Sequence, residues 1–333
     1  MDGSLTFHSV SAPALVPHRL ERARAGLSYL TRQYVGSGSF PSFISSHPDF
    51  KDGCLAPPET FSTALVLTCL AESDFKLSSH ERLLDKLNAC FAKDGFVHLF
   101  EDHSLLPADV DCSVVAIDAL LKNGRSATPE LHRALDRIAS NTDAKGVLRV
   151  YLDADPLRAR RVDASVCVNA LYTFACLGRE GELSGSAAYV AQQLDAGHCE
   201  ASARYYPSPD LFLYFVSRLV RDFGWAEQRF GPRARERLLQ RCGDVLSANV
   251  LELAARACAA SNLGLTAEDE LCTLADAQQE DGSWRASPCL RFGRTQRYLG
   301  GECLTTALAL RALMSDSLPA QLRQPQRRLE AVG

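Results

Sequence analysis

The sequence of 333 residues lacks several features that would assign it to common classes of protein. It has no run of about 18 uninterrupted apolar residues, which a membrane-spanning helix requires. Its first residues, Met1 to Val16, lack the positive start and continuous apolar stretch of a secretory signal. The formal net charge is -4, whereas broad nucleic-acid binding normally needs a basic surface. We therefore expect a cytoplasmic protein that binds a small molecule and makes at most peripheral contact with a membrane.

The cysteines and the short motifs exclude further classes. Twelve cysteines are present, but no two have the Cys-x-x-Cys spacing, and most lie in apolar stretches where a free thiol behaves as a small hydrophobic group. This pattern favours a reducing compartment. The sequence has no Gly-x-Ser-x-Gly, P-loop or dinucleotide-binding motif. His198-Cys199 is the one adjacent His and Cys pair and has no further ligands near it, so we expect no metal site.

An internal repeat of about fifty residues runs through the chain. Glu59 to Leu70 aligns with Asp109 to Leu120 and with Arg161 to Tyr172, and three weaker copies follow. The equivalent positions are Phe61, Asp111, Asp163, Asp210, Leu251 and Leu304. Six units result, and each repeat segment is apolar on nearly every side, which is typical of a fully buried helix.

Between these segments the sequence predicts helices with one charged face. They are expected at Pro17 to Tyr34, Ser79 to Phe91, Pro129 to Asn141, Gly185 to Asp195, Arg233 to Asp244 and Ala267 to Gln279. Buried helices that alternate with amphipathic ones indicate an inner and an outer ring, so we predict an all-α fold, an α6–α6 toroid around a central cavity. The alternative is an open solenoid of helical pairs. We predict a single domain over residues 1–333 with a flexible tail at 316–333.

The links from outer to inner helices share a glycine followed by an apolar residue. Examples are Asp94-Gly-Phe96, Lys145-Gly-Val147 and Asp281-Gly-Ser-Trp284. Glycine gives the backbone freedom for a tight turn, and the apolar residue is expected to wedge between units. The last copy, Gln278 to Trp284, resembles the Gln-Trp repeat of triterpene cyclases and related prenyltransferase subunits.

The stretch Asp109-Val-Asp-Cys-Ser113 sets two carboxylates at the start of the second repeat helix. It resembles the Asp-x-Asp-Asp acid motif of class II terpene cyclases, and its Asp-Cys-Ser part resembles the Asp-Cys-Thr core of oxidosqualene cyclases. The resemblance implies that Asp111 is the general acid, that Asp109 is its neighbour and that Cys112 helps to orient it. Such an acid must stay protonated near neutral pH, which burial and a second carboxylate both favour. Asp109 also suits a helix N-cap.

Carbocation chemistry requires a dry cavity with aromatic faces. The residues predicted to contact substrate are Phe61, Asp163, Tyr172, Phe212, Tyr214, Trp284, Arg161 and Arg294. The two arginines belong to basic clusters that precede inner helices, where an anion such as a diphosphate would also meet helix N-termini. Only two tryptophans and 8% aromatic residues indicate a cavity less aromatic than that of a triterpene cyclase.

The prediction is a terpene or meroterpenoid cyclase that protonates an alkene or epoxide of a linear isoprenoid, of C10 to C20 length because only one toroid is present. No cofactor is expected, except Mg²⁺ if the substrate carries a diphosphate. One alternative is a toroid that binds a prenyl or lipid tail without chemistry. Another is a toroid enzyme that uses paired carboxylates, Asp111 with Glu59 or Asp163. The oligomeric state stays open.

Overall fold

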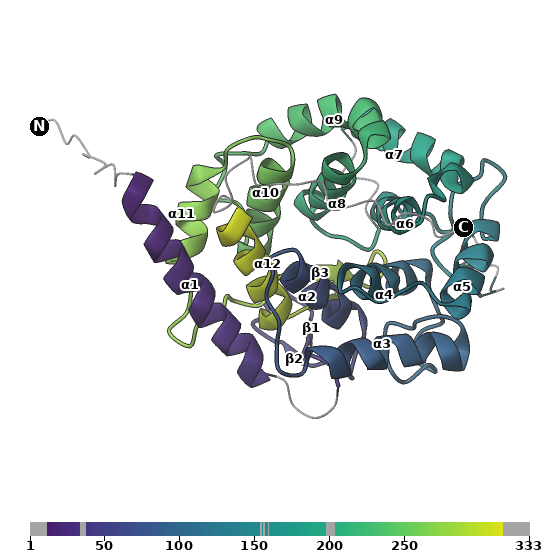
Figure 1. Ribbon diagram of the computed structural model, residues 1–333, viewed down its shortest axis with the longest axis horizontal. Helices are drawn as coiled ribbons and strands as arrows, with labels where there is room; N and C mark the ends of the chain where they lie inside the picture. The colour runs from purple at the N-terminus through teal and green to yellow at the C-terminus, as the bar shows by residue number, and fades with distance from the viewer. Residues whose placement is uncertain are drawn as a thin grey trace, which may run out of the picture.

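The chain forms two concentric rings of helices (Figure 1). The computed structural model describes residues 12–33, 38–153, 155, 157–158, 160–197 and 204–315. The inner ring consists of α2 (Phe61–Ala71), α4 (Val110–Lys122), α6 (Ala164–Cys176), α8 (Pro209–Asp222), α10 (Val250–Asn262) and α12 (Glu302–Ser315). The outer ring consists of α1 (Ala12–Gln33), α3 (His80–Asp94), α5 (Pro129–Ser140), α7 (Ser184–Ala196), α9 (Gly224–Leu239) and α11 (Glu268–Asp276), with a short 3-10 helix at Glu180–Leu183. The predicted helical toroid is confirmed.

The ring is closed. Each inner helix packs against the next one along the chain, from α2 to α12. The last inner helix, α12, then packs against the first, α2, and also against the outer helix α1 (Figure 1). An open solenoid would leave its first and last units apart, so that alternative is wrong.

The inner helices all begin on one rim of the toroid. Each outer helix runs back between two inner helices, so the inner helices point in the same direction. Side-chain caps define four of the starts, those of α4, α6, α8 and α10. Asp109, for example, accepts the N–H of Cys112 at 2.7 Å, and Asp163 accepts that of Ser165 at 2.9 Å. We call the segments that lead into the inner helices, 38–60, 95–109, 141–163, 204–208, 240–249 and 277–301, the mouth rim.

Glycine turns lie at the entries to the mouth rim, as the sequence predicted. Gly95, Gly146 and Gly282 have φ angles of 73°, 74° and 92°, in the left-handed region that favours glycine. Trp284, which follows the last of these turns, is fully buried, and its Nε1 donates to the carbonyl of Leu274 at 2.7 Å. Trp284 is therefore a packing wedge between units.

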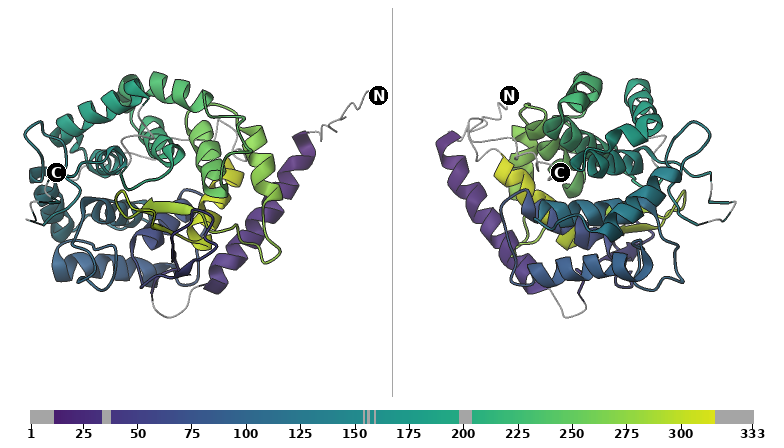
Figure 2. Two further views of the ribbon diagram at one scale, coloured as in Figure 1. Left: turned by 180° about the vertical axis from the view of Figure 1, so that it is seen from behind. Right: turned by 45° about the vertical axis from the view of Figure 1, so that its right-hand side comes forward.

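A small sheet on the mouth rim was not predicted. Its strands are β1 (Phe43–Ser45), β2 (Cys54–Leu55), β3 (Pro288–Arg291) and β4 (Tyr298–Gly300), in the antiparallel order β2-β1-β4-β3. β1 precedes the first inner helix, whereas β3 and β4 precede the last one. The sheet thus joins the two ends of the ring on this rim (Figure 2, left).

One outer helix differs from its prediction. The predicted range, Arg233 to Asp244, begins just after Pro232, a residue that removes a backbone donor from a helix. The helix α9 instead runs through Pro232, with Phe230 and Ala234 buried on either side, so packing outweighs that cost. The predicted tail, 316–333, lies outside the described residues. No helix in the described ranges is long and apolar enough to cross a membrane, and the cytoplasmic location stays a prediction.

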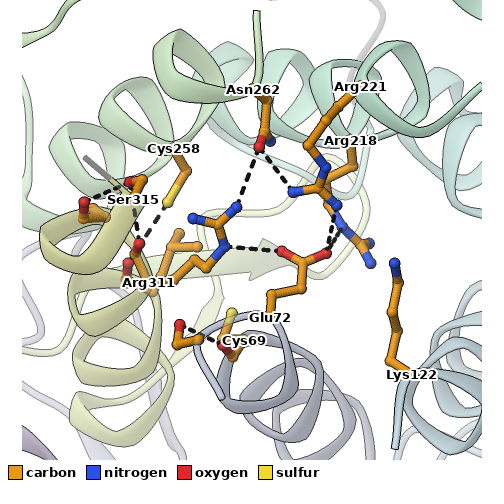
Figure 3. Close-up of polar contacts among 12 residues, drawn as sticks. Cys69, Glu72, Lys122, Arg218, Arg221, Cys258, Asn262, Arg311 and Ser315 are labelled. Atoms are coloured by element: carbon orange, nitrogen blue, oxygen red, sulfur yellow. Dashed lines mark hydrogen bonds and ion pairs between the residues drawn. The ribbon is translucent and has the colours of Figure 1, made fainter. Parts of the chain in front are cut away.

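A network of charges fills the opposite end of the ring (Figure 3). Glu72, at the end of α2, accepts hydrogen bonds from Arg218 and Arg221 of α8 and from Arg311 of α12, at 3.0, 3.2 and 3.1 Å. Asn262 of α10 accepts from Arg221 and Arg311. Burial alone raises the pKa of Glu72, but the three guanidinium groups outweigh it and hold the pKa well below its usual value.

The remaining inner helices also reach this network. In α4, Asp118 accepts from Arg218 at 2.6 Å, and Lys122 forms an ion pair with Asp222 at 3.3 Å. Tyr172 of α6 donates to Asp222 at 2.5 Å. Because cations are favoured at helix C-termini, a basic cluster suits this end of the ring. The network ties all six inner helices together away from the mouth rim.

Candidate active site

A cavity of about 320 Å³ opens at the mouth rim, where α4 and α6 begin. Asp109, Asp111 and Cys112 form part of its wall, and the loop between β3 and β4 covers one side with residues 290–295. Phe61, from the start of α2, lies at the same cavity. The structure therefore brings the predicted acid motif to a concave site lined by both apolar and basic side chains.

Asp111 is held by two hydrogen bonds. The hydroxyl of Tyr206 donates to Oδ2 at 2.5 Å, and Nδ2 of Asn169 donates to Oδ1 at 2.9 Å. The same Nδ2 lies 3.3 Å from the hydroxyl oxygen of Tyr206, which can accept its second proton. Both partners are buried in the ring, Asn169 on α6 and Tyr206 just before α8. These contacts fix the orientation of the carboxyl group at the cavity wall.

Burial changes the acidity of Asp111. Loss of solvent is the main cause that raises its pKa to about 7, and the charges of Asp109 and Asp163 act in the same direction. The hydrogen bonds from Asn169 and Tyr206 oppose the rise, because they stabilise the ionised form. A carboxyl group with this pKa is largely protonated below neutral pH. After it loses its proton, the carboxylate still accepts the hydrogen bonds from Tyr206 and Asn169. Both properties suit a general acid.

Asp109 has a structural role and also borders the cavity. Its Oδ1 caps α4 by accepting the N–H of Cys112, as predicted from the repeat. Burial raises its pKa to about 6, and the hydrogen bond from Cys112 acts in the opposite direction. Cys112 is itself buried, and its thiol pKa is raised far above the usual value by burial and by the two nearby carboxylates. The thiol therefore stays protonated.

Arginines and phenols surround the outer part of the cavity. Arg161, Arg204, Arg291 and Arg294 all line it. The guanidinium of Arg161 lies 5.7 Å from the ring centre of Tyr151. The buried hydroxyl of Tyr205 and the buried Nε of Arg204 have no hydrogen-bond partner among the described residues. The outer part of the site thus carries positive charge.

The structure brings some of the predicted substrate-contact residues to this cavity and places others elsewhere. Phe61, Arg161 and Arg294 line the cavity with the acid motif. The other predicted substrate contacts do not line it: Asp163, Tyr172, Phe212, Tyr214 and Trp284. The carboxylate oxygens of Asp163 accept hydrogen bonds from the backbone N–H groups of Ser165 and of residues 204 and 205. Tyr172 belongs to the charge network at the far end, while Phe212 and Tyr214 are buried in α8.

Tyr206 and Asn169 were missed as partners of the acid. Asn169 is a lone polar residue on an otherwise apolar stretch of α6, which was the available signal. Tyr206 lies on the link before α8, and nothing local distinguishes it from Tyr205. The described residues contain no group of three or more His, Cys, Asp or Glu side chains that could hold a metal ion.

Comparisons with known proteins agree with this geometry. Residues 58–176 match the family model described as the sesquiterpene cyclase astC-like C-terminal domain. Drimenol cyclase from Aspergillus calidoustus is 31% identical over 218 residues, which are 65% of this chain and 39% of that enzyme. The match thus spans well under half of the curated relative. The matched family segment contains Asp109, Asp111 and Asn169.

Solved structures share the fold. A variant of the type II terpene cyclase MstE from Scytonema, in complex with merosterolic acid A, superposes with a TM-score of 0.68 at 13% identity over 92% of this chain and 99% of that one. For ent-copalyl diphosphate synthase from Streptomyces platensis the TM-score is 0.58 at 18% identity, over 78% of this chain and 50% of that one. The chain therefore shares the helical toroid fold seen in type II terpene cyclases, and the family match is confined to residues 58–176.

Proposed function

We propose that this protein is an acid-initiated terpene cyclase in which Asp111 protonates a linear isoprenoid. The observation that carries the proposal is the buried carboxyl of Asp111, held by Tyr206 and Asn169 at the wall of a cavity. The relationship to a drimenol cyclase and the shared fold of type II terpene cyclases support the same reaction class.

The reaction begins when the proton of Asp111 is transferred to the terminal C=C bond. The π electrons form the new C–H bond, and the tertiary cation that results is attacked by the next C=C bond, which closes a ring. The last cation loses a proton, so the reaction is an isomerisation overall. Asp111 is left as a carboxylate, and the hydrogen bonds from Tyr206 and Asn169 stabilise that negative charge. The step needs no cofactor because Asp111 supplies the proton.

Aromatic rings near the acid are placed to stabilise the carbocation intermediates of the reaction. Phe61 lines the cavity, and its ring packs edge-on against Tyr206 at 6.2 Å between centres. Tyr151 and Tyr205 pack edge-on at 6.0 Å on another part of the wall. The faces of such rings attract cations, and the exclusion of water prevents water from capturing the carbocation before the rings have closed.

The volume of the cavity supports a short substrate. Small-molecule sites are commonly about 300–1,000 Å³. The present cavity of about 320 Å³ lies at the lower end of that range. A chain of C10 to C20 length, such as a sesquiterpene precursor, suits it better than a triterpene precursor.

The arginines favour a substrate with an anionic head. Arg158 is neutralised by Asp153 and Asp155, at 2.7 and 2.9 Å. No such ion pair is seen for Arg161 or Arg204 in the described ranges. A diphosphate would accept from Arg161 and Arg204, which line the cavity, with Mg²⁺ as its natural counterion. Proton transfer at the far end of the chain leaves this head group intact.

The alternatives have less support. A pair of catalytic carboxylates made by Asp111 and Asp163 is disfavoured, because Asp163 binds backbone N–H groups. Glu59 borders a separate cavity of about 250 Å³ and accepts from Ser42 at 2.6 Å. A toroid that only binds a prenyl tail would not require a buried protonated carboxyl at its cavity wall.

The test is incubation with geranyl, farnesyl and geranylgeranyl diphosphates and with the corresponding alcohols, followed by mass spectrometry of the products after phosphatase treatment. We expect a cyclic isomer from one diphosphate, and no cyclic product from Asp111→Asn. Tight binding of a prenyl ligand to wild type, without any cyclic product, would instead support the binding protein. Assays with and without Mg²⁺ show whether the head group needs the ion.

A further inference from the structure

Exposed leucines gather at the mouth end of the toroid. The described part of the chain has six large hydrophobic side chains that are exposed. Five of them lie at this end: Leu55, Leu105, Leu157, Leu239 and Leu246. The sixth, Leu20, belongs to the outer helix α1. Single exposed leucines are ordinary on a protein surface, but a concentration on one face marks an interaction site.

Four of these leucines occupy equivalent places in the repeat. Leu55, Leu105, Leu157 and Leu246 lie on the segments that lead into α2, α4, α6 and α10, and Leu239 ends α9. Leu157 is 82% exposed and Leu246 is 98% exposed, so neither contributes to the core. Because the inner helices are parallel, these segments share one rim. The opposite end of the ring carries the charge network instead (Figure 3).

Basic side chains lie on the same rim. Arg160 is exposed in the segment that contains Leu157, and Arg294 and Arg297 are exposed between β3 and β4. The exposed acids of the rim are Asp49, Asp52, Glu101, Asp102, Asp244, Glu280 and Asp281, and none of them lies in the segment before α6 or between β3 and β4. Asp52 accepts from serines 45 and 46, and Glu101 pairs with Lys86. The part of the mouth formed by the segment before α6 and the β3–β4 loop is therefore basic, which complements an anionic surface.

We propose that the mouth rim docks on a phospholipid bilayer that carries anionic headgroups. The leucines enter the interfacial layer, and Arg160 and Arg297 meet the headgroups, which is the combination that holds peripheral proteins at membranes. The cavity then faces the lipid surface. Entry of an isoprenoid chain from the bilayer is a consequence that rests on the proposed function, whereas the docking itself does not.

The experiment is sedimentation of the full chain with vesicles of phosphatidylcholine alone and of phosphatidylcholine with phosphatidylserine. We expect wild type to bind the anionic vesicles, and to bind the neutral ones more weakly. The double variant Leu157→Ser/Leu246→Ser should bind anionic vesicles at least about tenfold more weakly, since burial of each leucine contributes to partition. Leu20→Ser is the matched control and should bind as wild type does. Arg160→Gln/Arg297→Gln should lose the preference for anionic vesicles.

Circular dichroism and the thermal midpoint of each variant exclude a folding defect. Wild type that stays in the supernatant with both kinds of vesicle would overturn the proposal, as would equal losses in Leu20→Ser and the double variant. Light scattering decides whether the leucines serve a second copy of the chain instead. A dimer that Leu157→Ser/Leu246→Ser dissociates would also refute membrane docking. Cyclisation of a dissolved diphosphate tests the proposed function separately and does not depend on these results.

Discussion

The hydrogen bond from the hydroxyl of Tyr206 offers a way to change the pKa of Asp111 without removing the acid. It donates to Oδ2 of Asp111 at 2.5 Å, and Tyr206 is fully buried. Tyr206→Phe removes this donor and keeps the ring that packs on Phe61. A hydrogen bond to a charged group contributes about 1.5–3 kcal/mol. Since one pKa unit corresponds to about 1.4 kcal/mol, the pKa of Asp111 should rise by about one to two units.

The sign of the pH effect follows from the form that reacts. Protonated Asp111 is the acid, so kcat/KM is constant at low pH and falls as the pH rises through its pKa, which burial raises to about 7. In Tyr206→Phe this fall should occur at a higher pH. At low pH, where both enzymes are protonated, the variant should be about 10- to 100-fold slower, because the conjugate base loses a donor.

The assay is the pH profile of kcat/KM for cyclisation of the preferred diphosphate, with thermal midpoints to verify folding. Tyr205→Phe is the matched control, because its hydroxyl has no hydrogen-bond partner in the described structure and does not contact Asp111. That variant should keep the fall near pH 7 and change only KM. If Tyr206→Phe keeps both the rate and the profile of wild type, the assignment of Tyr206 is refuted.

Three further variants test the surroundings of the acid and the ring. Asp109→Asn keeps a good helix cap but removes a charge that raises the pKa of Asp111. The fall in kcat/KM should therefore move to lower pH. An unchanged pH profile would contradict the coupling between the two carboxyl groups. Arg161→Gln should raise KM for a prenyl diphosphate and leave the turnover of the prenyl alcohol unchanged, in steady-state assays of both substrates. Glu72→Gln should lower the free energy of unfolding in urea by about 3–5 kcal/mol because it leaves the buried guanidinium of Arg311 without a carboxylate partner. Asp195→Asn, at an exposed ion pair with Arg233, should change it by at most about 1 kcal/mol, and similar losses in both variants would argue against the network.

The ring was predictable because each unit carries its signal locally. Segments such as Phe61 to Leu70 are apolar all round, which places them inside a double ring before any contact is known. The sheet was not predictable, because its strands have two to four residues and β1 pairs with a strand from the last unit. The start of α9 was missed because packing around Pro232 overrides the usual effect of proline.

In the site, too, the residues that are adjacent in the sequence were predictable, and those brought together only by the fold were not. Asp109, Asp111 and Cys112 stand next to one another in the sequence, so a short motif reveals them. The partners of Asp111 come from α6 and from the link before α8, and only the closed ring brings them together. Tyr172 does not line this cavity, because it stands near the C-terminal end of α6 whereas the cavity opens where that helix begins. It lies at the far end of α6, in contact with Asp222.

The central claim is that Asp111 delivers a solvent-exchangeable proton to the substrate carbon chain. Cyclisation in D₂O measures this directly, since the acid carries deuterium before each turnover. We predict a cyclic product with one added deuterium, located on the former CH carbon of the terminal C=C bond, and no cyclic product from Asp111→Asn. An unlabelled cyclic product in D₂O, or labelled product formed by Asp111→Asn at the wild-type rate, would contradict the account.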